Sequence, residues 1–166
     1  DQRICLAVNY SIDKSSLVLS LFAPYWMVNH IKEDITYRVD DKLLYRHGKQ
    51  LAEPFLLCFD PSTVSKKERF SLAINSSSFS EHVPLNVVPY SGTTMPLAKS
   101  KKYKFSVNVN IELAGIGLSK IVTISSFYSV LNISKQTVEY SENNEDWFAI
   151  GSQITQPFFS TRLSDQ

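Results

Sequence analysis

A repeat with an offset of 103 residues is the feature that most constrains the fold of this chain. Asn29 and Asn132 each end an apolar run, "FAPYWMVNH" at 22–30 and "SSFYSVLNI" at 125–133. One ungapped register relates residues 4–56 to residues 107–159. It matches the residue pairs Tyr25/Tyr128, Asn29/Asn132, Lys32/Lys135, Tyr37/Tyr140, Gly48/Gly151, Gln50/Gln153, Pro54/Pro157 and Phe55/Phe158. Chance does not hold one register over such a length, so the chain contains a repeated unit.

The repeated unit has the size of a small domain. It is longer than the units of helical and solenoid repeats, which span about 20–50 residues. The offset predicts one complete β module at residues 1–103 and the first part of a second, homologous module at residues 104–166. Because modules in series bury surface against their neighbours, neighbouring modules of the same chain are expected partners.

The hydrophobic pattern predicts strands throughout. Residues 4–10 and 105–113 alternate between apolar and polar, and residues 17–28 and 120–131 are dense apolar runs. Turn sequences such as "VDDK", "FDPST", "NSSS" and "PYSG" separate shorter strands expected at 34–39, 43–47, 54–59, 69–74 and 82–88. No segment carries a helical stripe. The pattern predicts an all-β fold of antiparallel β-sandwich-like modules in tandem.

Composition removes several classes of protein. The chain has 166 residues, 43% of them hydrophobic and 20% charged, which is typical of a globular protein. Its net charge of +1 argues against a nucleic-acid partner. The run Leu17–Val28 is shorter than the ~20 residues that span a bilayer, and no signal peptide precedes it. A chain that begins at Asp1 is expected to be a piece of a longer protein.

The sequence is poor in catalytic and metal-binding patterns. His30, His47 and His82 are scattered and do not recur in the repeat, and no nucleophile or phosphate-loop motif is present. The acidic turn "VDDK" at 39–42 has two adjacent carboxylates of the kind that bind calcium. The aligned turn "ENNE" at 142–145 has amides at the same two positions, so an ordinary polar turn is the favoured interpretation. Cys5 and Cys58 lie in apolar runs and are expected to be buried thiols rather than a disulfide. The chain is therefore predicted to be no enzyme and to need no cofactor or metal.

The two asparagine-ended runs are the candidate site. Pro24 lacks an N–H group and belongs at a strand edge or bulge. The amides of Asn29 and Asn132 are expected to hold a strand-to-turn corner, whether for folding alone or for shaping a partner site. The aromatic residues beside these corners are either core residues or a surface for proline rings. They are Tyr25, Trp26, Phe127, Tyr128 and Trp147.

Repeated all-β modules without catalytic groups commonly bind peptides along a strand edge. Two alternatives stay open. One is a structural spacer without a ligand of its own. The other is a membrane-surface domain that uses the lysine cluster at 99–104, which is otherwise a solvated loop.

The segments "LSLFAPYWMVNHIKEDITYR" and "IVTISSFYSVLNISKQTVEYSENNEDWFAIG" resemble the adaptor-binding domain of the vacuolar protein sorting 13 family of bridge-like lipid-transfer proteins. The family pattern is an aliphatic strand, a Pro-aromatic step, a hydrophobic pair and an asparagine. Ala23, Pro24, Tyr25, Trp26 and Asn29 match it in the first module. Phe127, Tyr128 and Asn132 match it in the second, where Ser126 replaces the proline.

The resemblance implies a function. The family's domain is a series of six all-β modules, each with such an asparagine, that recognises Pro-x-Pro motifs of organelle-specific adaptors. It implies a cytoplasmic protein, peripheral at membrane contact sites and touching the membrane only indirectly. In the family, peptide recognition is associated with the last modules. The peptide site therefore falls on this piece wholly, in part or not at all, depending on which modules it holds.

Overall fold

The computed structural model describes residues 4, 6–39, 43–49, 53–59, 68–94, 96, 105–115, 117–142 and 144–159. Every regular element among them is a strand, which confirms the predicted all-β class. The strands are β1 (Ala7–Asp13), β2 (Ser16–Phe22), β3 (Tyr25–Asn29), β4 (Ile35–Val39), β5 (Leu43–His47), β6 (Phe55–Leu57), β7 (Arg69–Ile74), β8 (Val83–Pro84), β9 (Tyr90–Thr94), β10 (Val107–Leu113), β11 (Lys120–Ser126), β12 (Tyr128–Leu131), β13 (Val138–Tyr140), β14 (Phe148–Ile150) and β15 (Thr155–Phe158).

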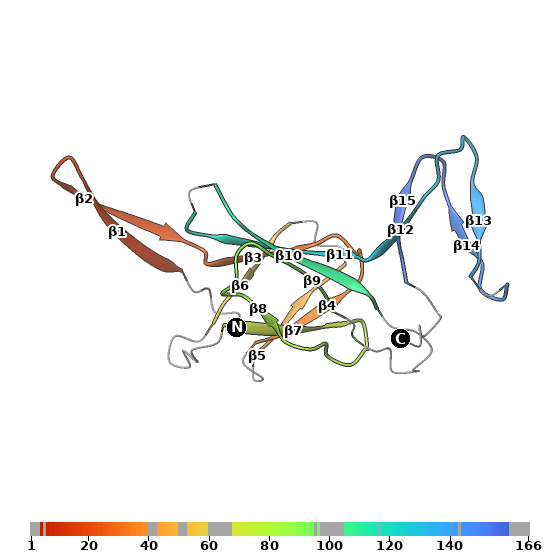
Figure 1. Cartoon of the computed structure of the whole chain (residues 1–166), viewed down its shortest axis with the longest axis horizontal. Helices are drawn as coiled ribbons and strands as arrows, with labels where there is room; N and C mark the ends of the chain where they lie inside the picture. Colours follow the sequence, from red (N-terminus) through yellow and green to blue (C-terminus); the bar gives the residue numbers. More distant parts are fainter. Residues whose placement is uncertain are drawn as a thin grey trace.

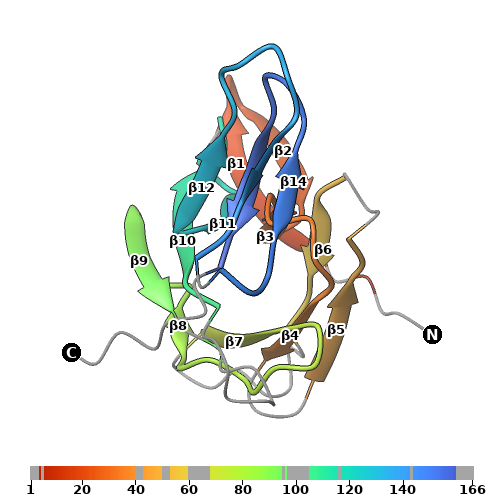
Figure 2. The same cartoon turned by 90° about the vertical axis from the view of Figure 1, so that its right-hand side faces the viewer.

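Two sheets form a β-sandwich in the middle of the molecule. A five-stranded sheet has the order β6-β3-β11-β10-β9, and a four-stranded sheet has the order β5-β4-β7-β8. Figure 2 shows the first sheet arched above the second. Inward-facing residues of both sheets share one hydrophobic core, which includes Met27, Tyr37, Phe70, Ile111 and Ile124. The sandwich therefore draws strands from both sides of the predicted module boundary at residue 103, and that boundary stays a prediction.

All strand pairs are antiparallel except one. β11 lies parallel to β3, with Lys120 opposite Tyr25 and Ile124 opposite Asn29. Parallel neighbours need a long crossover between them, and here the rest of the first sandwich provides it. The pairing extends past the strand end, because the His30 N–H donates to the Ile124 carbonyl at 2.8 Å.

Two smaller parts lie at opposite ends of this sandwich. The β1–β2 hairpin extends from one end, and the pairs β12–β15 and β13–β14 lie at the other (Figure 1). One matching pair of strands holds the same register in both halves. Ile35 lies opposite His47 in β4–β5, and Val138 lies opposite Ile150 in β13–β14, each residue 103 positions further on.

The strand predictions were correct for the regular segments and wrong at two places. The run at 17–28 breaks into β2 and β3 at Ala23–Pro24, as expected for a residue that cannot donate to a ladder. Of residues 82–88 only Val83–Pro84 are strand. The segment "PYSG" was predicted as a turn, but Tyr90 begins β9, which pairs with β10. A partner strand thus overrides the local turn composition.

Candidate functional site

Asn132 closes the turn that follows β12. Its side-chain N–H groups reach the carbonyl oxygens of Gln136 at 2.7 Å, Gly151 at 2.9 Å and Ile150 at 3.0 Å. Its carbonyl oxygen accepts from the Ser134 N–H at 2.9 Å and from the Ser134 hydroxyl at 2.8 Å. The side chain is buried, so these bonds replace water and join the end of β12 to the end of β14.

Asn29 makes the same local turn after β3. Its amide N–H donates to the carbonyl of Glu33 at 2.8 Å, four residues on, and its oxygen accepts from the Ile31 N–H at 3.0 Å, two residues on. Asn132 bonds to the residues at the same two spacings, Gln136 and Ser134. The two asparagines thus hold equivalent strand-to-turn corners.

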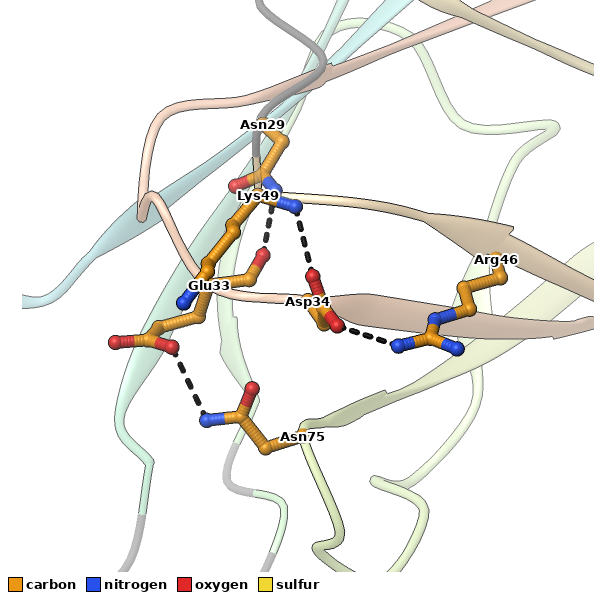
Figure 3. A network of polar contacts seen from close by, with 6 residues as sticks. All are labelled: Asn29, Glu33, Asp34, Arg46, Lys49 and Asn75. Carbon is orange, nitrogen blue, oxygen red and sulfur yellow. Dashed lines mark hydrogen bonds and ion pairs between the residues drawn. The ribbon is translucent and has the colours of Figure 1, made fainter.

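A polar cluster supports the first corner (Figure 3). Asp34 accepts from the Lys49 N–H at 2.8 Å and pairs with the Arg46 guanidinium at 2.6 Å. These two contacts, the Lys49 N–H first, lower the pKa of Asp34. The Asn75 amide donates to the Glu33 carboxylate at 3.1 Å. The turn after β3 is therefore tied to the ends of β5 and β7.

Tyr25 belongs to the core rather than to the surface. It is 3% exposed, and its ring packs against Phe59 with 5.2 Å between centroids. Its hydroxyl donates to the Glu68 carboxylate, and the Lys120 ammonium lies 5.1 Å from its ring centroid. Burial, followed by the hydrogen bond and charge of Glu68, raises the pKa of Tyr25. Pro24, beside it, accepts from the Lys120 N–H at 2.8 Å through its carbonyl.

Trp26 points to the opposite face of the same strand. In the sheet register it lies between Leu56 of β6 and Ile121 of β11. Trp26 and Ile121 are each 36% exposed, and Leu56 is half-buried. We call these three side chains the outer row. The row crosses three strands and starts at β6, which is the terminal strand of its sheet in the described part of the chain.

The strands on either side of the second corner, β12 and β14, begin beside more exposed aromatic rings. Phe127 and Tyr128 are 46% and 52% exposed, and their rings meet edge to face with centroids 4.7 Å apart. Trp147 is also exposed, near the start of β14. Of the five aromatic residues considered, only Tyr25 is therefore a buried core residue.

Several other sequence predictions concern residues that form no site. Cys58 is a buried thiol, as predicted, whereas Cys5 lies outside the described residues. His47 is buried, and its Nδ1 lies 3.2 Å from the Tyr37 hydroxyl. Among the described residues no cluster of His, Cys, Asp and Glu has the arrangement of a metal site. The lysine cluster at 99–104 and residues 40–42 of "VDDK" lie outside the described residues.

Sequence comparison identifies the family to which this chain belongs. The family model for the vacuolar-sorting associated protein 13 adaptor binding domain matches residues 1–166. The chain belongs to the vacuolar-sorting associated protein 13 adaptor binding domain family. This membership confirms the resemblance noted in the sequence and makes the chain part of a protein-binding domain, not an enzyme.

The similar curated proteins are far longer than this member of the adaptor binding domain family. Mouse intermembrane lipid transfer protein VPS13A is 25% identical over 161 residues, which cover 96% of this chain and 5% of the relative. Human intermembrane lipid transfer protein VPS13C is 29% identical over 157 residues, which cover 90% of this chain and 4% of the relative. The mouse VPS13C protein is 28% identical over 153 residues. No helix among the described residues of the adaptor binding domain is long and apolar enough to cross a membrane.

Local sequence patterns do not reveal the residues that complete the surroundings of the first corner. Lys120, Glu68 and Ile121 lie 43 to 95 residues from Tyr25 and Trp26 along the chain, so no local pattern links them. The parallel pairing of β3 with β11 brings Lys120 and Ile121 to this place, and the packing of the four-stranded sheet beneath it brings Glu68. In this adaptor binding domain the described candidate surfaces are thus the outer row and the Phe127–Tyr128 pair.

Proposed function

We propose that this chain binds Pro-x-Pro segments of adaptor proteins, and that the outer row of Leu56, Trp26 and Ile121 is the contact surface. The observation that carries the proposal is the exposed Trp26 ring, which lies between two apolar neighbours on a completed sheet next to a terminal strand. Membership of an adaptor-binding family supports a protein as the ligand.

The chemistry of the outer row suits proline. A proline-containing segment is pre-organised in an extended conformation and loses little entropy on binding, and its rings pack well on aromatic faces. Among the described strands β6 pairs with β3 alone, so its other edge can pair with the non-proline residues of a peptide. The asparagine corner at Asn29 fixes the end of β3 and so the position of the Trp26 ring.

We further propose that the adaptor places the longer protein at organelle membrane contact sites from the cytoplasm. The relatives are named intermembrane lipid transfer proteins, which supports this role for a chain that resembles a small part of them. In this proposal the chain contacts the adaptor, and the membrane is reached only through it.

The test uses the two tryptophans of the chain, Trp26 and Trp147. In a Trp147→Phe variant, Trp26 is the single tryptophan and its fluorescence reports on the outer row. Titration with a Pro-x-Pro peptide should shift this fluorescence, and an alanine-substituted peptide should not. Trp26→Ala should raise the Kd measured by anisotropy with a labelled peptide about tenfold or more, as expected for an aromatic anchor that the bound peptide covers. Trp147→Ala, an equally large truncation of an exposed ring, is the control.

Two outcomes contradict the proposed surface. If binding survives Trp26→Ala and is lost in Tyr128→Ala, the peptide binds at the second corner instead. If the folded chain does not bind any Pro-x-Pro peptide at high concentration, this piece is a structural spacer. A thermal melt of each variant separates loss of binding from loss of folding.

A further inference from the structure

The β1–β2 hairpin carries an apolar face that nothing in the described structure covers. The register pairs Val8 with Leu21, Tyr10 with Leu19 and Ile12 with Leu17, so all six side chains share one face. They are between 59% and 78% exposed, and the other face of β1 carries small or polar residues. We call this surface the donor face. Exposed apolar patches of this extent mark sites of interaction.

The chain itself contains the covered equivalent of this hairpin. At the 103-residue offset, Val8, Leu19 and Leu21 correspond to Ile111, Val122 and Ile124 of the β10–β11 hairpin. These three residues have 0% exposure because β11 lies next to β3 inside the sandwich. The hairpins differ by two residues in register, and a shift of two keeps every side chain on its face.

The strand beside which the β10–β11 hairpin lies is β3, and we call it the acceptor strand. Its counterpart at the 103-residue offset is β12. β3 has β6 on one side and β11 on the other, whereas β12 has only β15 among the described residues. The counterparts of core residues are correspondingly exposed. Tyr128 is 52% exposed against 3% for Tyr25, and Val138 is 42% exposed against 0% for Ile35. Among the described strands no hairpin lies beside β12, and no strand lies beside the β1–β2 hairpin.

We propose that the β1–β2 hairpin of one copy of this chain inserts beside β12 of a second copy, as β10–β11 inserts beside β3. The observed parallel register, transferred by the offset, places Leu17 opposite Tyr128, Leu19 opposite Val130 and Leu21 opposite Asn132. Backbone pairing along the edge of β12 supplies affinity, and the donor face buries the exposed side of the second module.

The two surfaces cannot meet within one molecule. The β1–β2 hairpin and β12 lie at opposite ends of the sandwich (Figure 1). The contact is therefore head to tail, and head-to-tail contacts that do not close a ring give open chains.

The test is the mass of the full 166-residue chain in solution, by light scattering or sedimentation, over a concentration series. The wild-type chain should associate beyond dimers as concentration rises. Leu19→Lys should be monomeric because it places a charge on the donor face. Val130→Lys should be monomeric because it places a charge on β12, the strand beside which the hairpin would insert. Ser20→Lys and Leu131→Lys place the same charge on the opposite faces of the same strands and should still associate.

Mixing the two monomeric variants gives the decisive measurement. Leu19→Lys keeps an intact acceptor and Val130→Lys keeps an intact donor, so an equimolar mixture should form dimers and stop there. Dimers also demonstrate that both variants are folded. A wild-type chain that stays monomeric overturns the proposal, as does association that Leu19→Lys abolishes but Val130→Lys does not. This proposal is independent of peptide binding at Trp26, because neither variant touches the outer row.

Discussion

Replacing Asn132 with serine should destabilise the fold around β12–β15 more than replacing Asn29 destabilises the fold around its own corner. The amide supplies two N–H donors to a region where three backbone carbonyl oxygens, those of Gln136, Ile150 and Gly151, lie within 3.0 Å. A serine hydroxyl has one donor and is shorter. It can satisfy at most one of these acceptors and loses the contact to the Ser134 N–H.

The magnitude follows from the number of bonds. A net hydrogen bond contributes about 0.5–1.5 kcal/mol, and a buried group left without a partner costs about 1–3 kcal/mol. Loss of one or two buried bonds at Asn132 should therefore cost about 2–3 kcal/mol of the free energy of unfolding. Asn29 is less buried and its amide reaches one carbonyl, that of Glu33, so Asn29→Ser should cost only about 1 kcal/mol.

The assay is thermal and urea unfolding of Asn132→Ser, Asn29→Ser and Asn86→Ser. For a chain of this length about 2–4 °C is lost per kcal/mol, so Asn132→Ser should melt about 4–12 °C below wild type. Asn86 is exposed between β8 and β9 and serves as the control, with an expected change within about 0.5 kcal/mol. Equal melting temperatures for Asn132→Ser and Asn86→Ser would refute the view that the amide holds the corner.

Three further predictions concern the first sandwich. Met27→Ala should cost about 2–5 kcal/mol in urea unfolding because the side chain is fully buried, whereas Val130→Ala at the matching, half-buried position should cost less. The pKa of Asp34 is lowered in the folded state, so its carboxylate stabilises the fold fully at pH values above the unfolded pKa of about 3.9. This contribution is lost as the pH falls through the lower, folded pKa. Arg46→Met should raise that pKa in an NMR titration, and an unchanged value would contradict the ion pair. Burial raises the pKa of Tyr25 and Tyr37, so their stabilising effect is complete below the unfolded pKa of about 10 and is lost above it. Ultraviolet titration should show tyrosines that ionise only as the protein unfolds at alkaline pH, and ionisation of all eight before unfolding would contradict this burial.

The sequence predicted what local patterns control. Alternation and β-branched residues located most strands, and Pro24 located the break between β2 and β3. The spacing of Asn29 and Asn132 drew attention to two turns whose hydrogen bonds are equivalent in the structure. These features depend on neighbours a few residues away, so one sequence is enough to find them.

The sequence could not predict what distant segments control. The parallel pairing of β3 with β11 joins residues 95 positions apart, and it decides that Tyr25 is buried while Tyr128 is exposed. The two tyrosines are identical in the repeat, so their different surroundings cannot be read from local composition. The same pairing makes the outer row, because Ile121 reaches Trp26 only across the two strands.

The position of β9 determines how early this chain can complete its fold during synthesis. β9 pairs only with β10 among the described strands, so a strand made early joins its sheet through a hairpin made later. The ribosome must add about 30 more residues after Thr94 before β11 is complete, which takes roughly 2–6 s at about 5–20 residues per second. Throughout that interval β3 and β9 have no bridge between them. The sandwich therefore finishes folding only after β10 and β11 have been translated.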